Sequence, residues 1–223
     1  NARYGILLDY CKKNRIKTLL TAHNLEDQVE TFFIRLSRGS GLKGLSSMKP
    51  LSKINNKVNL SRPLLDIKKK FLIKISKIIF GNYIVDPSNK NSKFLRSKVR
   101  KLKRPLEQSG IKYEQIFKSI QNLALSKSTL DSYFDKIFKD LIKKKENKIE
   151  INFKKYSELN KDTKIALINE AIKRLKKNYY DLRSKKVANL IINLNKSGFR
   201  KSCLGGCIFF KKGENLCLKI ENH

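Results

Sequence analysis

Apolar and polar positions follow patterns along the first hundred residues that predict three helices and one short strand. Residues 16–22 form an apolar run without a turn residue, which is typical of a buried strand. Helical spacing of apolar residues predicts helices over residues 2–14, 27–38 and 68–80. The order helix, strand, helix is typical of a parallel sheet flanked by helices, so we expect an α/β fold.

The predicted helix at residues 27–38 separates an apolar stripe from a polar side. The stripe recurs at i, i+3, i+4 and i+7 and is expected to pack on a sheet; it comprises Val29, Phe32, Phe33 and Leu36. The opposite side carries Asp27, Glu30, Thr31, Arg35 and Arg38. His23 lies just past the carboxyl end of the predicted strand, where open α/β sheets bind ligands. Gly39 to Gly41 end the helix, because glycine adopts the left-handed cap conformation without steric cost.

From about residue 105 onward the pattern becomes helical and rich in lysine, and we expect a domain boundary there. The expected domains are residues 1–107 and 108–223. Four apolar stripes predict the helices of the second domain; they begin at Ile116, Leu130, Ile165 and Val187. Paired apolar segments predict a hairpin around Asn55-Asn56 and another that closes the chain, over residues 205–220.

The charge of the chain favours a polyanionic partner such as nucleic acid. The 223 residues include 51 Lys and Arg against 19 Asp and Glu, a net charge of +32. Forty of the basic residues are lysine, and Asn and Ile are also frequent, so a genome rich in A and T is an alternative source of the excess.

Several classes of protein are disfavoured. No run approaches the roughly 18 to 20 apolar residues of a membrane span, so we expect no membrane association. The four cysteines show no C-x-x-C pair and the chain has only two histidines, so we expect no metal site. Reduced thiols in a cytoplasmic protein are the expected state. The chain opens without Met or a signal peptide, and we expect it to be a fragment that begins inside a longer protein.

Charged side chains of the 27–38 helix could bind ions. Asp27 and Glu30 lie one turn apart, and the helix dipole stabilises a carboxylate in the first turn. Such a pair can bind an ammonium ion or accept its proton, whereas Arg35 and Arg38 can hold phosphate. The alternative is a solvated face with ordinary charge pairs between neighbouring turns.

A second polar segment covers residues 86–100. Asp86-Pro87-Ser88-Asn89 predicts a turn whose side chains can cap a following helix. Arg96 and Arg100 share a helix face and repel each other unless an anion lies between them. The alternative is a plain turn followed by a solvated basic helix.

These residues resemble the tRNA(Ile)-lysidine synthases, members of the PP-loop ATP pyrophosphatase superfamily. The family signature A-H-x-x-D-D-Q-x-E-T is matched by His23, Asp27, Gln28, Glu30 and Thr31, and R-G-S-G-L-x-G-L by residues 38–45. Arg62-Pro63-Leu64-Leu65 and the D-x-S-N segment with its two arginines are similar as well. Glu26 replaces the first Asp of the signature and keeps its charge. The resemblance runs over nearly the whole chain but is specific only in the first hundred residues.

The resemblance implies the C-terminal part of a parallel-sheet PP-loop domain at 1–107, followed by a mainly helical, lysine-rich tRNA-binding domain at 108–223. In this family ATP, with Mg²⁺ as the expected counter-ion of its phosphates, adenylates the C2 carbonyl oxygen of cytidine 34 in the CAU anticodon of tRNA(Ile). Free L-lysine then displaces AMP. The family's S-G-G-x-D-S phosphate loop is absent from this sequence, so we expect the chain alone to be inactive.

The same resemblance implies roles for particular residues. Asp27 and Glu30 are expected to be catalytic, binding the lysine ammonium and taking its proton. His23, Arg35 and Arg38 are expected to bind the nucleotide. Contacts with substrate or tRNA are expected from Arg62, Asp86, Asn89, Arg96 and Arg100. A homodimer is a further expectation.

Two rival functions remain open from the sequence. Another PP-loop enzyme, such as a tRNA thiolase, would activate a base in the same way, but such enzymes usually carry cysteines for sulfur transfer. Here Cys11 lies on an expected packed face and no C-x-x-C pair exists. The other rival is a non-catalytic basic RNA-binding protein that retains the signature as a relic.

Overall fold

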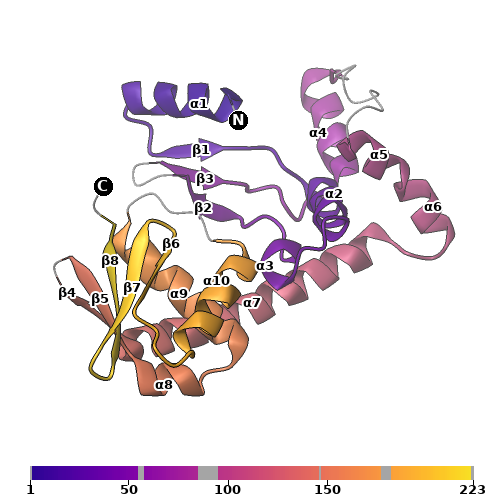
Figure 1. Ribbon diagram of the computed structural model, residues 1–223. Coiled ribbons are helices and arrows are strands. Elements are labelled where there is room, and N and C mark those ends of the chain that lie inside the picture. Colours follow the sequence, from indigo (N-terminus) through magenta and orange to yellow (C-terminus); the bar gives the residue numbers. More distant parts are fainter. Residues whose placement is uncertain (1, 55–57, 85–94, 146, 177–181, 222–223) are drawn as a thin grey trace. The chain divides into compact units, whose positions relative to one another are not determined.

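The computed structural model describes residues 2–54, 58–84, 95–145, 147–176 and 182–221 (Figure 1). The chain divides into two compact units, residues 1–128 and 129–223, and each is described by itself. The division falls inside a helix, α7 (Tyr113–Leu141), whereas the sequence pattern placed a boundary before this helix.

The first unit is a small mixed sheet with helices. Its strands are β1 (Thr18–Leu20), β2 (Leu51–Lys53) and β3 (Asn59–Ser61). Their order is β1-β3-β2, with β1 parallel and β2 antiparallel to β3. The helices are α1 (Ala2–Lys13), α2 (Leu25–Leu36), α3 (Leu42–Leu45), α4 (Lys69–Phe80), α5 (Leu95–Lys101), α6 (Lys103–Gln108) and the first half of α7. The predicted first hairpin is confirmed, because β2 and β3 pair and Ile54 N donates to Val58 O at 3.1 Å.

The start of α2 is set by a capping box that the apolar pattern did not predict. The Asn24 side chain accepts a hydrogen bond from Asp27 N, and the Asp27 carboxylate accepts one from Asn24 N, both at 3.1 Å. These two bonds satisfy amides that the first helical turn leaves without partners. The helix therefore begins two residues before the predicted start. At its other end, Gly39 has φ +66° and Gly39 N donates to Leu36 O, as expected of a glycine that ends a helix.

The apolar stripe of α2 packs against a helix and not on the sheet, contrary to the prediction. Val29 is fully buried and lies in one cluster with Tyr113, Ile116 and Ile120 of α7. The predicted strand also differs from expectation, because Leu20 is 66% exposed and β1 is not buried. Helical spacing identifies an apolar face but does not identify its partner.

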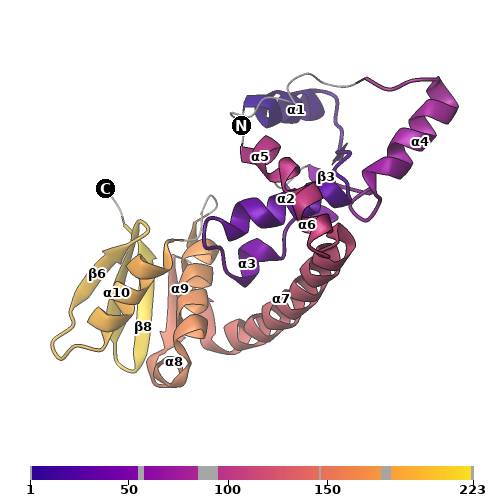
Figure 2. The same cartoon turned by 90° about the vertical axis from the view of Figure 1, so that its right-hand side faces the viewer.

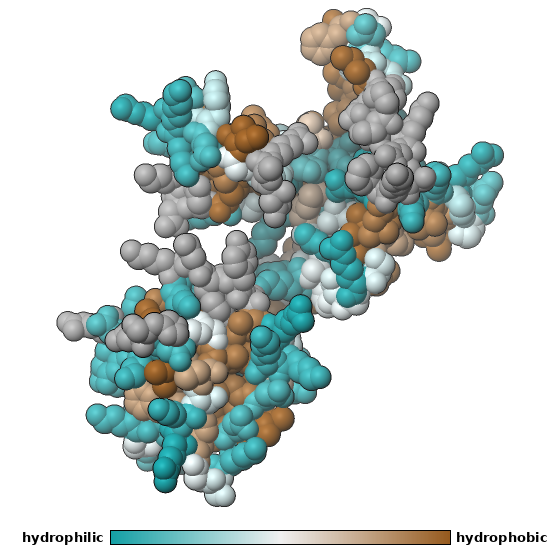
Figure 3. Space-filling view, turned by 45° about the horizontal axis from the view of Figure 1, so that its top comes forward, coloured by the Kyte–Doolittle hydropathy of each residue, from teal (hydrophilic) through white to brown (hydrophobic). Residues whose placement is uncertain are grey.

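Helix α4 was predicted from the same spacing, yet none of its residues is buried. Its exposed apolar residues are Phe71, Ile75, Ile78, Ile79 and Phe80. Figure 3 shows a brown, hydrophobic surface at the upper right, where Figure 1 places this helix.

The second unit combines three helices with a five-stranded antiparallel sheet (Figure 1). The strands are β4 (Ile142–Lys145), β5 (Lys148–Asn152), β6 (Lys201–Leu204), β7 (Cys207–Lys212) and β8 (Asn215–Ile220), in the order β4-β5-β8-β7-β6. The helices are α8 (Phe153–Glu158), α9 (Lys161–Leu175) and α10 (Ser184–Leu194). The closing hairpin is confirmed as β7–β8, but β4, β5 and β6 were not predicted. Residues 148–152 do alternate polar and apolar positions, a period-two signal that could have revealed β5.

The core of the second unit lies between the helices and one face of this sheet. Leu167 and Ile168 of α9 and Leu194 of α10 are fully buried against Ile149 and Leu218 of the sheet. The end of α7 adds Phe138 and Leu141 to the same core. The predicted apolar stripes of these helices are therefore confirmed as core faces. The four cysteines are free thiols.

Candidate functional site

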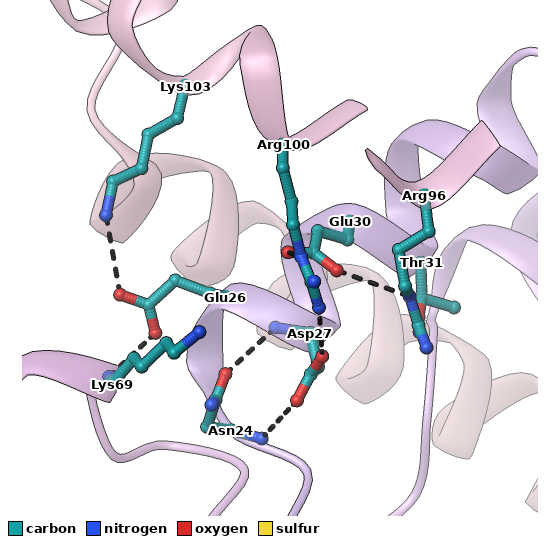
Figure 4. Close-up of polar contacts among 9 residues, drawn as sticks. All are labelled: Asn24, Glu26, Asp27, Glu30, Thr31, Lys69, Arg96, Arg100 and Lys103. Atoms are coloured by element: carbon teal, nitrogen blue, oxygen red, sulfur yellow. Dashed lines mark hydrogen bonds and ion pairs between the residues drawn. The ribbon is translucent and has the colours of Figure 1, made fainter. Parts of the chain in front are cut away.

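Helix α5 brings two arginines onto the acidic side of α2 in the first unit. Figures 1 and 2 both place α5 beside α2, and the close-up in Figure 4 shows the side chains that meet between them. Arg100 Nε donates to Glu30 Oε1 at 2.6 Å, and Arg96 Nε lies 3.2 Å from Glu30 Oε2. Arg100 Nη2 is also 3.7 Å from Asp27 Oδ1. The anion expected between the two arginines is therefore the Glu30 carboxylate of the same chain.

Glu30 is buried, contrary to its predicted place on a solvated face. Its residue is 3% exposed because α5 covers this side of α2. Nothing in the spacing of residues 27–38 could indicate the cover, which comes from a segment about seventy residues further along. Thr31, next to Glu30, accepts a hydrogen bond from Arg96 Nη2 at 3.2 Å, so this polar side is a packed interface of charged groups.

The protonation of this cluster reflects burial opposed by ion pairing. Burial raises the pKa of Glu30, and the hydrogen bond and charge of Arg100 only partly offset that rise. The hydrogen bond to Glu30 in turn raises the pKa of Arg100. Tyr113, which packs beneath the cluster, has a pKa raised to about 12 by burial and by nearby carboxylates. Arg100 therefore stays charged, and Glu30 is the group whose proton uptake the surroundings favour.

The other acidic residues at the start of α2 are held less tightly. Glu26 Oε2 accepts a hydrogen bond from Lys69 N at 2.8 Å, and Glu26 Oε1 lies 3.4 Å from Lys103 Nζ. Asp27 has a side chain that is 17% exposed, and its nearest charged partner is the 3.7 Å contact with Arg100. Among these three carboxylates, Asp27 is thus the one that can most easily bind another cation in place of Arg100.

Arg35 anchors the loop that follows α2. Its Nη1 donates to Gly44 O at 2.7 Å and to Ser47 O at 2.9 Å. Burial and the nearby charge of Arg62 lower the pKa of Arg35. Because its guanidinium holds two backbone carbonyls, Arg35 supports the segment around α3 in this structure; the predicted phosphate contact remains a prediction.

Gln28 fixes the same loop, a role that the sequence pattern did not predict. Its side-chain amide donates to Met48 O and accepts from Met48 N, both at 2.9 Å, while Ser47 Oγ donates to Gln28 O at 3.2 Å. Ser47 has φ +59°, in the left-handed region that a non-glycine residue seldom adopts. The only available signal was the presence of an uncharged amide among charged neighbours on the helix.

Arg62 lines a cavity of about 710 Å³ within the first unit. Its Nη1 donates to Lys49 O at 2.9 Å and to Ser52 Oγ at 3.1 Å. Its buried Nε has no hydrogen-bond partner among the described residues. The apolar part of the wall includes Met48, Leu65, Phe117 and Ile120. Arg62 thus lies in the wall of a cavity large enough for a small molecule, while its Nε is buried away from solvent.

The surroundings of the remaining predicted residues are known only in part. His23 Nδ1 is 2.9 Å from Thr21 Oγ1, and Arg38 is exposed after the end of α2. Asp86 and Asn89 lie outside the described residues. The structure therefore brings Asp27, Glu30, Arg96 and Arg100 together and does not bring the predicted nucleotide-binding arginines, Arg35 and Arg38, into the same cluster.

The first turn of α2 does not fit the phosphates of ATP. A helix N-terminus binds phosphate through free amides and a positive dipole. Here Asn24 caps the amide of Asp27, and Glu26 and Asp27 place two carboxylates in the first turn. The same carboxylates suit an ammonium ion instead.

Within the described part of the chain, no group of three or more His, Cys, Asp or Glu side chains is arranged to hold a metal ion. Nor is any described helix long and apolar enough to cross a membrane.

Residues 1–106 match the family model of the PP-loop domain. This part of the chain is therefore similar to the PP-loop domain. Along nearly its whole length the chain is similar to curated tRNA(Ile)-lysidine synthases. That of Wolbachia pipientis wMel is 31% identical over 99% of this chain and 52% of its own length, and that of Ruegeria pomeroyi is 29% identical over 96% and 51%. That of Orientia tsutsugamushi is 46% identical over 45% of this chain and 22% of its own length. The chain spans about half the length of the first two relatives.

Proposed function

We propose that this chain is part of a tRNA(Ile)-lysidine synthase, which joins free L-lysine to C2 of cytidine 34 in the CAU anticodon of tRNA(Ile) at the expense of ATP. The observation that carries the proposal is the similarity to the Wolbachia synthase over 99% of the chain, which includes both α2 and α5. The PP-loop match over residues 1–106 supports ATP as the nucleotide. ATP supplies an adenylate that makes the C2 oxygen of cytidine a good leaving group. Mg²⁺ is proposed as the counter-ion of its phosphates.

In this proposal, residues of α2 bind the amino group of the substrate lysine and accept its proton. Free lysine has a pKa near 10.4 and must lose a proton before it can attack. We assign ammonium binding and proton acceptance to Asp27, because its carboxylate is partly exposed and only loosely paired with Arg100 at 3.7 Å. Glu30 is assigned a supporting role, as the buried anion that holds Arg96 and Arg100 in place.

The other residues enter the proposal according to their surroundings. His23 and the exposed Arg38 are proposed to contact the nucleotide, and Arg62, which lines the cavity, to contact substrate. Asp86 and Asn89 are proposed to contact tRNA. Residues 108–223 are proposed to be a tRNA-binding part. A cytoplasmic location and a homodimer belong to the same proposal and are tested by fractionation and by the solution mass of the protein.

The test is lysidine formation by the complete gene product that contains this chain. Purified protein would be incubated with ATP, labelled lysine and a tRNA transcript with a CAU anticodon, and AMP release and the mass of nucleoside 34 would be measured. We expect AMP to form only when lysine and this tRNA are both present. Incorporation of sulfur in place of lysine would support a thiolase, and tRNA binding without AMP would support a non-catalytic protein.

The role of Asp27 is tested in the same assay. Asp27→Asn should lower kcat by roughly 10²- to 10⁴-fold, the usual loss when a positioned acid or base is removed. Asp9→Asn is the matched control, because Asp9 is exposed on α1 and pairs only with Lys12. Wild-type turnover by Asp27→Asn at saturating lysine would remove Asp27 from the proposal.

A further inference from the structure

The five-stranded sheet of the second unit has one face that its helices do not cover. Ile149, Leu218 and Phe209 point into the core, toward α9 and α10. Successive residues of a strand point to opposite faces, so the positions between them lie on the other face of the sheet. The strand register places six lysines there: Lys143, Lys145, Lys148, Lys201, Lys212 and Lys219. We call this surface the lysine face.

Three of these lysines stand directly opposite one another. Lys145 pairs in register with Lys148, which pairs in register with Lys219. Like charges at opposed positions of neighbouring strands destabilise a sheet, so this row favours an anion beside it. A polyanionic ligand would supply more negative charge than the protein itself places there.

Among the described residues, Glu150 is the carboxylate that forms ion pairs with this row. Glu150 lies on the same face, two residues after Lys148 and directly opposite Lys143. Its carboxylate is 2.9 Å from Lys145 Nζ and 2.8 Å from Lys148 Nζ. Its hydrogen bonds to Lys148 and Lys145 lower its pKa to about 2, so it remains an anion at neutral pH. A single carboxylate thus serves two of the three opposed ammonium groups.

A surface hollow of about 530 Å³ lies at the end of this row. The described residues of its lining are Lys145, Asn147, Lys148 and Lys219. Ammonium groups and one amide converging on a hollow form a set of donors suited to a phosphate.

The rest of the lysine face adds features that a nucleic acid can use. Phe210 and Ile208 of β7 are partly exposed on this face and offer apolar contact to a base or a ribose. The second carboxylate, Glu221, lies at the β6 side, where its side chain bonds to the thiol of Cys203. Glu221 therefore lies across the sheet from the hollow, whereas Glu150 lies beside it.

We propose that the lysine face docks the sugar-phosphate backbone of RNA, with one phosphate held in the hollow between Lys145, Lys148 and Lys219. The inference rests on the proposed function for the choice of tRNA as the RNA. Lysine acts as a point charge toward phosphate and reads no base, so this docking is independent of the anticodon. It locates the contact on strands, whereas the resemblance implied a mainly helical tRNA-binding domain.

The test compares two triple variants of the 223-residue chain in binding to a fluorescent tRNA transcript over a range of salt concentrations. Lys143→Gln/Lys145→Gln/Lys219→Gln removes three charges from the lysine face and leaves the Lys148–Glu150 pair intact. Lys161→Gln/Lys185→Gln/Lys186→Gln removes three exposed charges from α9 and α10 and is the matched control. Melting followed by circular dichroism checks that both variants fold.

We expect the lysine-face variant to bind tRNA at least roughly 10-fold more weakly near 0.1 M salt. Its slope of log K against log salt should fall in magnitude by about 2 to 3, because each phosphate contact contributes roughly 0.7 to 0.9. The control should lose less than about threefold. Equal losses of affinity in the two variants, or no loss in either, would overturn the proposal. Such a result would favour the alternative that the excess of lysine reflects a genome rich in A and T.

A second variant tests the same surface in the opposite direction. Glu150→Gln removes the competing carboxylate, so it should strengthen tRNA binding severalfold; weaker binding by a folded Glu150→Gln protein would contradict the proposal.

Binding to vesicles of anionic lipid but not to tRNA would overturn it in favour of a membrane surface. Lysidine formation distinguishes this inference from the proposed function. If the complete protein makes lysidine and the lysine-face variant keeps its KM for tRNA, only the surface assignment fails.

Discussion

Single residues decide what the acidic helix can do, and Glu30 is the clearest case. A buried carboxylate between two arginines is stable only while its partners remain, since an unpaired buried charge carries a large desolvation penalty. Glu30 meets this condition through Arg96 and Arg100 of α5. The sequence showed which acidic and basic residues this region contains. It did not predict that these residues pair with one another, because pairing depends on how α5 lies against α2.

Replacing Glu30 should therefore weaken folding as well as activity. Glu30→Gln should lower the free energy of unfolding by about 2 to 3 kcal/mol. This is below the roughly 3 to 5 kcal/mol of a fully buried pair, because the arginine side chains are 41% and 31% exposed. Denaturant unfolding measures the change. Asp27→Asn is the comparison and should lose about 1 kcal/mol, from its capping bond.

A double-mutant cycle separates the ion pair from other effects of the substitution. Arg100→Gln should also destabilise the protein, and the Glu30→Gln/Arg100→Gln variant should lose less than the sum of the two single changes. Strict additivity would mean that the 2.6 Å contact contributes little to stability.

Glu150 gives a prediction for pH. Its folded pKa of about 2 lies below the ordinary value of 4.5, because Lys148 and Lys145 favour the carboxylate. Its contribution to stability is therefore fully present above about pH 4.5 and is lost as the pH falls toward 2. Titration of the Glu150 carboxyl by NMR should give a midpoint near 2, and the midpoint should rise in Lys145→Gln/Lys148→Gln. A midpoint near 4.5 in the unmodified chain would contradict the ion pairs.

At the scale of elements, α2 and α4 show what helical spacing does and does not reveal. Both were predicted from apolar residues on one face, and both exist close to their predicted bounds. The apolar face of α2 is packed against α7, whereas α4 presents its face to solvent. Spacing within a segment depends on that segment alone, but burial depends on another part of the chain. For the same reason β1 was predicted to be buried and is not.

The difference between these helices can be measured by substitution. Ile78→Gln/Ile79→Gln on α4 should change the free energy of unfolding by no more than about 0.5 kcal/mol, because the two residues are 72% and 64% exposed. Val29→Ala on α2 should cost about 2 kcal/mol, since it removes fully buried methyl groups and leaves a cavity. Chemical denaturation of both variants provides the comparison. A large loss from the α4 pair would mean that its apolar face is covered in solution.

At the scale of the whole chain, composition and signature residues predicted the class and the family, while the distribution of charge differed from expectation. Residues 1–128 contain 28 Lys and Arg against 8 Asp and Glu, and residues 129–223 contain 23 against 11. The basic excess is thus not confined to the second half. The sheet of the second unit was largely missed, because strands such as β4 are short and consist mostly of lysine.

Because of helix α7, the two units are hard to express as separate, folded fragments. Its 29 residues extend about 43 Å at 1.5 Å per residue, and its two halves complete different cores. A cut between Ser128 and Thr129 would leave new helix ends, each with four unpaired backbone groups. We expect a fragment of residues 112–223 to unfold cooperatively, while one of residues 129–223 loses protection of its amides from hydrogen exchange. Equal protection in both fragments would show that the first half of α7 is dispensable to the second unit. Because one helix completes both cores, a truncation within it is expected to weaken both units.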